Sequence, residues 1–296
     1  MIRAVKNSNT LQILKARCIR PFLHKRGYAD RKLNFYFLST GRVGTRFFSR
    51  VLDTATNARV FHQPGPQLKE TVVRDVVSKF VSDPDRFADL SIEDYPRLEE
   101  KILRQLTQPF EVYGDTLNHM FPFGAMLYRY LGPERLRLVH LIRHPVTCGR
   151  STLMVERDDD PTGGRFKELR PPEFLTGETP AEKTASIWNG VNGMIRTQFE
   201  MIDDSRVCRV VRLEDASPES LRELFQFLGL DGFSEEKVFK LMGDSSYSVR
   251  HSHIGNLSSD RKDASTEELE TIHRLCAPLA EHYDYDQSFD KVLESL

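Results

Sequence analysis

The stretch from Asn34 to Leu52, NFYFLSTGRVGTRFFSRVL, decides the fold of this chain. Phe35 to Leu38 is a short apolar run of the kind that forms a buried strand. Gly41 and Gly44 follow it and allow the backbone to turn tightly. The next apolar residues have helical spacing; they are Phe47, Phe48, Val51 and Leu52. The sequence therefore predicts a strand, a glycine loop and a helix in direct succession.

This loop has features that favour a bound phosphate-like anion. Its backbone N–H groups can converge on one point, and the helix that follows adds the positive end of its dipole. Arg42 and Arg46 add two permanent charges that can grip phosphate in a fork. A glycine turn of this kind is also common in proteins that bind nothing there. The loop differs from the nucleoside triphosphate motif G-x-x-x-x-G-K-[ST], because Gly44 comes too early and no Lys-Ser/Thr pair follows.

Length and composition limit the class of protein. The chain of 296 residues is long enough for one large α/β domain, which we place at residues 34–296. A net charge of −1 gives no indication of nucleic-acid binding. The four cysteines form no C-x-x-C pair, which argues against a zinc site or a disulfide framework and favours a reducing, cytoplasmic setting. No apolar run has the length of a membrane span or of a signal-peptide core.

Residues 1–33 form a basic extension before this domain. Their apolar residues have helical spacing, which Pro21 interrupts. A helix packed on the domain, or on an anionic surface, is one interpretation. Organelle targeting is the other, since transit peptides are basic and amphipathic.

Four more segments are predicted to be strands, and they alternate with helical patterns. The strands are expected at residues 58–62, 110–113, 136–142 and 206–213. The helices are expected at residues 70–81, 91–107, 184–202, 218–230 and 266–283, with one more after residue 145. This order predicts an α/β three-layer sandwich with a central, mainly parallel five-stranded sheet. Ligands bind such sheets at the carboxyl ends of the strands.

Polar residues follow two of these strands at that edge. His62 ends the second predicted strand, where it could either meet a ligand or cap a turn. Asp115 follows the third strand and could act as a base, orient a histidine or cap the next helix. His119 lies in the segment after it. His140, inside the fourth strand, is expected to be a satisfied core residue.

The fourth strand carries a second candidate for anion binding. Arg143 ends the strand, and Ser151 lies eight residues later, about two helical turns into the next helix. A guanidinium group and a hydroxyl in this arrangement can converge on a phosphate group. Residues 154–180 are rich in loop-forming residues, which is typical of a lid or a specificity loop.

These segments together resemble the sulfotransferases that use 3′-phosphoadenosine 5′-phosphosulfate (PAPS). The loop resembles their 5′-phosphosulfate motif, [KR]-S-G-[ST]-[ST], with Val43 and Arg46 as departures. The segment LIRHP at 141–145, with Ser151, resembles their 3′-phosphate motif. The segment RLED at 212–215, followed by a helix ending FLGL, resembles their R-Y-E-D segment, with Leu213 in place of the tyrosine. The resemblance covers about residues 33–285.

The resemblance implies a P-loop NTPase-like fold, PAPS as the sulfuryl donor and no metal. It places the donor's 5′ side on Gly41, Arg42, Val43, Gly44, Thr45, Arg46 and Phe47. It assigns the rest of the donor to Arg143, Ser151, Leu213, Arg250 and His251. The candidate catalytic residues are His62 as the base, Arg42 for the charge of the leaving phosphate, and Asp115.

The acceptor is not identified by the sequence. A small-molecule or glycan hydroxyl or amine is expected, and lipids and peptide tyrosines stay open. A homodimer is compatible with the sequence. Two alternative functions also stay open, namely a small-substrate kinase and a nucleotide-binding relative without catalytic activity.

Overall fold

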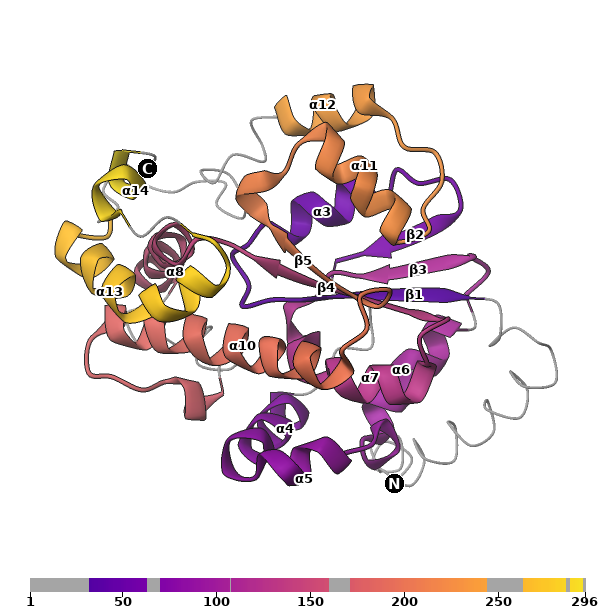
Figure 1. The fold of residues 1–296 in the computed structure, drawn as a ribbon, viewed down its shortest axis with the longest axis horizontal. Coiled ribbons are helices and arrows are strands. Elements are labelled where there is room, and N and C mark those ends of the chain that lie inside the picture. Colours follow the sequence, from indigo (N-terminus) through magenta and orange to yellow (C-terminus); the bar gives the residue numbers. More distant parts are fainter. Residues whose placement is uncertain are drawn as a thin grey trace, which may run out of the picture.

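A five-stranded sheet forms the centre of the molecule (Figure 1). The structure, a computed structural model, describes residues 32–62, 70–106, 108–159, 171–243, 263–285 and 288–294. The strands have the order β2-β3-β1-β4-β5, and neighbouring strands are parallel. They are β1 (Leu33–Leu38), β2 (Ala58–Phe61), β3 (Val112–Asp115), β4 (Leu136–Ile142) and β5 (Cys208–Arg212).

Helices cover both faces of the sheet (Figure 1). One face carries α3 (Thr45–Leu52), α11 (Pro218–Phe227) and α12 (Glu235–Gly243). The other carries α4 (Glu70–Ser82), α5 (Pro84–Asp89), α6 (Pro96–Leu106), α7 (Gly124–Leu131) and α10 (Pro180–Ile202). At one end lie α8 (Pro145–Asp159), α13 (Thr266–His282) and α14 (Phe289–Glu294). Short 3₁₀ turns are η1 (Ile92–Asp94), η2 (Asn118–Phe123), η3 (Pro172–Phe174) and η4 (Leu213–Asp215). The predicted three-layer α/β fold with a five-stranded parallel sheet is confirmed.

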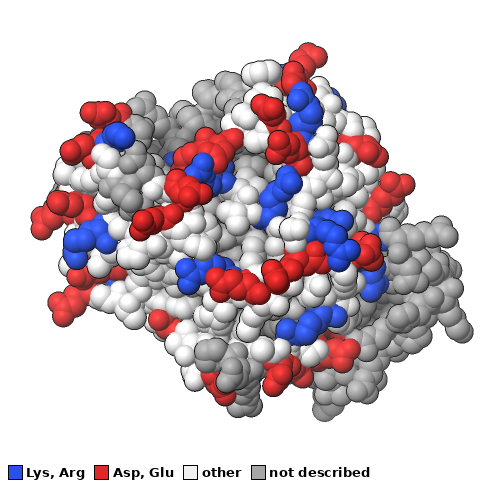
Figure 2. All heavy atoms as spheres, viewed as in Figure 1, with Lys and Arg blue, Asp and Glu red and all other residues white. Residues whose placement is uncertain are grey.

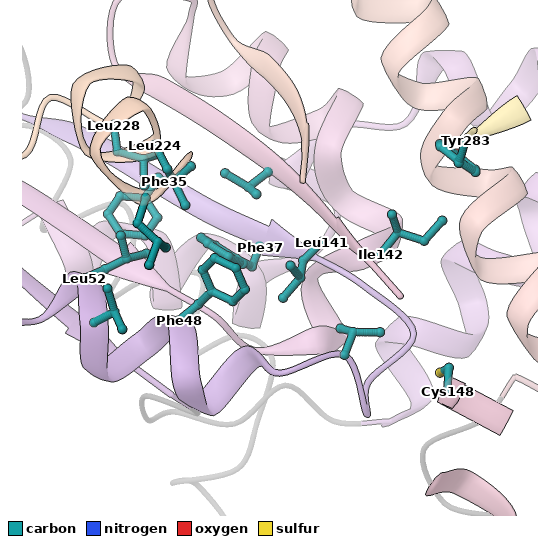
Figure 3. Packing of buried hydrophobic residues seen from close by; sticks show 14 of the residues in the cluster. Phe35, Phe37, Phe48, Leu52, Leu141, Ile142, Cys148, Leu224, Leu228 and Tyr283 are labelled. Atoms are coloured by element: carbon teal, nitrogen blue, oxygen red, sulfur yellow. The ribbon is translucent and has the colours of Figure 1, made fainter. Parts of the chain in front are cut away.

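The strand β1 supplies both layers of the core. Phe35 and Phe37 pack with Phe48 of α3 on one face (Figure 3). Tyr36 and Leu38 point to the opposite face, among the residues of α4, α6, α7 and α10. These four side chains of β1 have no solvent exposure. Successive strand residues point to opposite faces, so an uninterrupted apolar run indicates a strand that is buried on both sides.

The helix predictions are confirmed in type but not in every boundary. α10 begins at Pro180 rather than at 184, because Thr179 and Glu182 form a capping box there. α5 was not among the predicted helices; it begins at Pro84, in keeping with the preference of proline for the first helical position. α8 continues to Asp159, so the predicted loop at 154–180 begins later than expected.

Three further features of the chain are its N-terminal extension, the membrane-spanning potential of its helices and its surface charge. The predicted extension at 1–33 lies, up to residue 31, outside the described residues. Over the described ranges, no helix has the length and apolar character to cross a membrane. Basic and acidic side chains are intermixed over the face drawn in Figure 2.

His140 in β4 is held by side chains from α10. The Nδ2 atom of Asn192 donates to the Trp188 carbonyl at 2.8 Å. The Asn192 Oδ1 atom therefore accepts from His140 Nε2, which lies 2.9 Å away. Burial lowers the pKa of His140 to about 4, against the effect of this hydrogen bond. The prediction of a satisfied core histidine is confirmed.

This burial makes the stability depend on pH. In the unfolded chain the imidazole of His140 titrates at about 6.5. Between that pH and about 4, the unfolded chain binds the additional proton, so the free energy of unfolding falls as the pH falls. The loss from this one group approaches about 3 kcal/mol. Urea unfolding between pH 4 and 7 should show this slope in the wild type and a weaker one in His140→Gln. Equal slopes would contradict the assignment.

Gly114 in β3 provides a second test of the core. A Cβ atom at this position would lie 2.1 Å from the Phe35 ring. Gly114→Ala should therefore lower the free energy of unfolding by about 1–3 kcal/mol through overpacking. The matched control is Gly193→Ala in α10, where a Cβ atom meets nothing within 4 Å, and no loss is expected there. Equal stability of the two variants in urea unfolding would refute this packing.

Candidate functional site

Because the five strands are parallel, their carboxyl ends meet at one edge of the sheet. This edge has two halves. The glycine loop after β1 lies next to the ends of β4 and β5, with Arg143 and Leu213. On the other side of β1 lie the ends of β3 and β2, with Thr116 and His62.

The glycine loop has an unusual backbone conformation. Gly41, Arg42 and Gly44 all have positive φ, at 83°, 58° and 84°. Positive φ is uncommon for residues with a side chain, so Arg42 is held in a strained conformation by its surroundings. A Cβ atom at Gly44 would lie 2.8 Å from Leu213 Cδ1. Leu213, which the resemblance assigned to the donor site, thus packs against the glycine loop.

Val43 explains one departure from the sulfotransferase motif. Its side chain has no solvent exposure and belongs to the core cluster beneath the loop. It therefore anchors the loop from below and offers no hydroxyl at the site. The loop backbone and the side chain of Arg42 are partly exposed above it.

Three residues predicted from separate motifs come together at the mouth of this loop. Arg42 donates to Ser151 Oγ from both Nε, at 3.1 Å, and Nη2, at 2.9 Å. Arg143 Nη1 lies 3.3 Å from the carbonyl oxygen of Arg42. The indole N–H of Trp188 in α10 bonds the Arg143 carbonyl at 3.1 Å. Two guanidinium groups and a hydroxyl thus lie beside the glycine loop, a donor set suited to an anion.

The first turn of α3 carries the remaining residues of the predicted loop. Thr45 is buried and Arg46 is exposed at the surface. Partial burial, and then the charge of Arg50, lower the pKa of Arg46. Phe47 packs edge-on against Phe48, with 5.4 Å between the ring centroids. Of these side chains, Arg46 is the one that adds charge at the helix N-terminus.

Cys148 and Glu214, neither of which was predicted to have a role, also support the site. The Cys148 Sγ atom contacts the Gly41 carbonyl at 3.7 Å, and burial raises the pKa of this thiol. Glu214 accepts from the backbone N–H of His144 at 2.9 Å and from the Tyr285 hydroxyl at 3.1 Å. It therefore fixes the start of α8 at the end of β4. The signal available in the sequence for Glu214 was the RLED segment at 212–215.

The other half of the edge contains His62. Its Nδ1 atom lies 3.2 Å from Thr116 Oγ1, which itself donates to the Phe61 carbonyl at 3.3 Å. A hydroxyl has one proton, so Nδ1 must be the donor to Thr116 in the neutral ring. The lone pair of the neutral imidazole then lies on Nε2, the atom a general base would use.

Asp115 lies in the interior rather than at the open edge. It has no solvent exposure and forms an ion pair with Lys101 Nζ at 2.9 Å. Its Oδ1 atom accepts from the Leu117 N–H at 2.9 Å. Burial raises the pKa of Asp115, against the charge of Lys101. The structure therefore does not bring this predicted catalytic residue to where a substrate could touch it. The sequence did not predict a role for Lys101, because the charged residues of its helix are typical of a solvent-exposed face.

His119 lies beside the loop in η2. Its Nε2 atom is buried and has no hydrogen-bond partner in the described part of the chain. Burial, and then the charge of Lys101, lower the pKa of His119. Its neighbour Asn118 lies 3.1 Å from where a Cβ atom on Gly41 would be. η2 thus connects the two halves of the edge.

Arg250 and His251, which were predicted to bind the sulfuryl donor, lie outside the described residues. Within the described ranges, no three His, Cys, Asp or Glu side chains form a group that could hold a metal ion. A hollow of about 240 Å³ adjoins the ends of β4 and β5, lined by His144, Thr147, Arg212, Glu214, Asp215, Tyr285 and Val292.

Comparison with known proteins gives the following result. No family model matches the chain, and no curated protein matches it. The chain is similar to sulfotransferase STF9 from Mycobacterium avium, with 12% identity and a TM-score of 0.47 over 90% of this chain and 82% of that one. It is also similar to sulfotransferase STF1 from Mycobacterium tuberculosis H37Rv, with 14% identity and a TM-score of 0.44 over 90% and 83%.

Proposed function

We propose that this chain is a sulfotransferase, which moves the sulfuryl group of PAPS to a hydroxyl or amine of a small-molecule or glycan acceptor. The observation that carries the proposal is the convergence of Arg42, Arg143 and Ser151 beside the glycine loop. These residues come from two motifs about a hundred residues apart, and the same pair of motifs resembles the sulfotransferases.

In this proposal the glycine loop and the end of β4 hold the two ends of the donor. The loop backbone, the start of α3 and the charges of Arg42 and Arg46 would receive the 5′-phosphosulfate. Arg143 and Ser151 would receive the 3′-phosphate. The product 3′-phosphoadenosine 5′-phosphate (PAP) keeps both phosphate groups of PAPS. PAP is therefore the appropriate ligand for testing the donor site.

The chemistry requires charge stabilisation and a base. A sulfur–oxygen bond forms to the acceptor while the bond to the leaving phosphate breaks, and that phosphate gains negative charge. Arg42 would stabilise this charge at the mouth of the loop. The acceptor proton would pass to Nε2 of His62, whose Nδ1 is held by Thr116. Asp115 would act from the interior and without contact to the substrate.

The donor site is tested by calorimetric binding of PAP. Wild-type protein should bind PAP more tightly than ATP with magnesium. Arg143→Ala should weaken PAP binding by about 10- to 100-fold, which corresponds to the loss of a charged hydrogen bond. The control is Arg59→Ala on β2, an exposed arginine that pairs with Asp53, and this variant should bind as wild type does. A preference for ATP with magnesium would reject the proposal in favour of a phosphotransferase.

The base is tested by transfer of labelled sulfate from PAPS to a panel of phenols, alcohols, amines and sugars. His62→Ala should lower kcat by about 10²- to 10⁴-fold and leave PAP affinity unchanged. His119→Ala is the comparison, since His119 follows Asn118, which lies against Gly41, and its Nε2 atom is buried. A larger loss in His119→Ala would move the base to that residue. Tight PAP binding without transfer to any acceptor would indicate a nucleotide-binding protein without catalytic activity.

A further inference from the structure

Lys101 of α6 and Asp115 of β3 form an ion pair in the core of the protein. Their Nζ and Oδ2 atoms are 2.9 Å apart, and neither side chain has any solvent exposure. Removing two charges from water is costly, and apolar residues of similar volume often give equal or higher stability. The pair therefore needs an explanation other than the stability of the core.

The hydrogen bonds of the pair indicate what it holds. Gln105 Nε2 lies 3.5 Å from Asp115 Oδ2, and Gln105 Oε1 accepts from the Tyr36 hydroxyl at 2.5 Å. These bonds lie within the core and join α6, β1 and β3. The bond from Leu117 N–H to Asp115 Oδ1, at 2.9 Å, is different because it leads out to η2.

This bond reaches the residue directly before η2. Leu117 occupies this position: its N–H donates to Asp115, and its carbonyl accepts from the Met120 N–H at 3.2 Å in the first turn. The turn continues with Asn118, which lies against Gly41, and with His119 and its buried Nε2 atom. At its far end, Gln198 of α10 donates to the Phe121 carbonyl at 2.9 Å. Thus Asp115 fixes the end of η2 that borders the glycine loop.

We propose that Asp115 is a positioning residue for the transfer site, with Lys101 as its buried ion-pair partner. Asp115 holds η2 against the glycine loop through the Leu117 N–H, and the contact with Lys101 Nζ holds the Asp115 carboxyl in place. The pair thereby fixes the half of the edge that carries His62 relative to the half that carries the glycine loop. This inference rests on the proposed sulfotransferase function for its effect on catalysis. The holding of η2 can be measured without that function.

Two double variants separate positioning from packing. Lys101→Met with Asp115→Asn removes both charges, and the asparagine oxygen can still accept from Leu117 N–H. Lys101→Met with Asp115→Leu removes both charges and also removes that acceptor. Neither variant leaves an unpaired charge in the core, unlike the single substitutions. If the leucine variant does not fold, Asp115→Ala in the same background replaces it.

The measurements are hydrogen exchange of residues 117–119, PAP binding, and kcat for transfer. Both double variants should bind PAP within about threefold of wild type, because the donor residues are untouched. The leucine variant should exchange at least about tenfold faster at 117–119 and lose at least about tenfold in kcat. The asparagine variant should stay close to wild type in hydrogen exchange at 117–119 and in kcat.

The outcomes are distinguishable from failure of the proposed function. Equal exchange and equal kcat in the two double variants would overturn the positioning role. Faster exchange in the leucine variant with unchanged kcat would overturn its importance for transfer. If the wild type neither binds PAP nor transfers sulfate, the proposed function fails. The exchange contrast then still decides whether the pair holds η2.

Discussion

The parallel pairing of β1 with β3 on one side and β4 on the other is the constraint on which the site depends. It brings the carboxyl ends of these strands to one edge. It also fixes where the glycine loop begins, since Phe35 to Leu38 are wholly buried between two helical layers. A loop that leaves such a strand has little freedom at its origin. The strained conformation of Arg42 is therefore held by the fold.

The two halves of the edge carry different kinds of side chain, and this difference follows the strand order. The β1, β4 and β5 side carries Arg42, Arg143 and Ser151, which are donors suited to anions. The β2 and β3 side carries His62 and Thr116, which can handle a proton. η2 crosses between them beside Gly41. The proposed transfer of a group from one bound molecule to another would require both sides in a fixed relation, which a rigid sheet can provide.

The sequence predicted the sheet well because uninterrupted apolar runs mark buried strands. It also identified Arg143 and Ser151 as residues that could converge, and placed Arg42 in the glycine loop, but it did not predict that Arg42 donates to Ser151. It could not predict that Asp115 would be sealed in the core, because that depends on Lys101 in a helix with many charged residues. It likewise missed the packing of Leu213 on Gly44, a contact between residues distant in the chain. Side-chain partners of this kind follow from tertiary packing and leave no local pattern.

The hydrogen bond between Trp188 and the Arg143 carbonyl has a practical consequence. The chain contains one tryptophan, so its indole fluorescence comes from a single place. That place is a fully packed helix position one hydrogen bond away from the strand end that carries the Arg143 guanidinium. Any ligand that moves this strand end changes the polarity and geometry around the indole. The protein thus contains its own optical reporter beside Arg143.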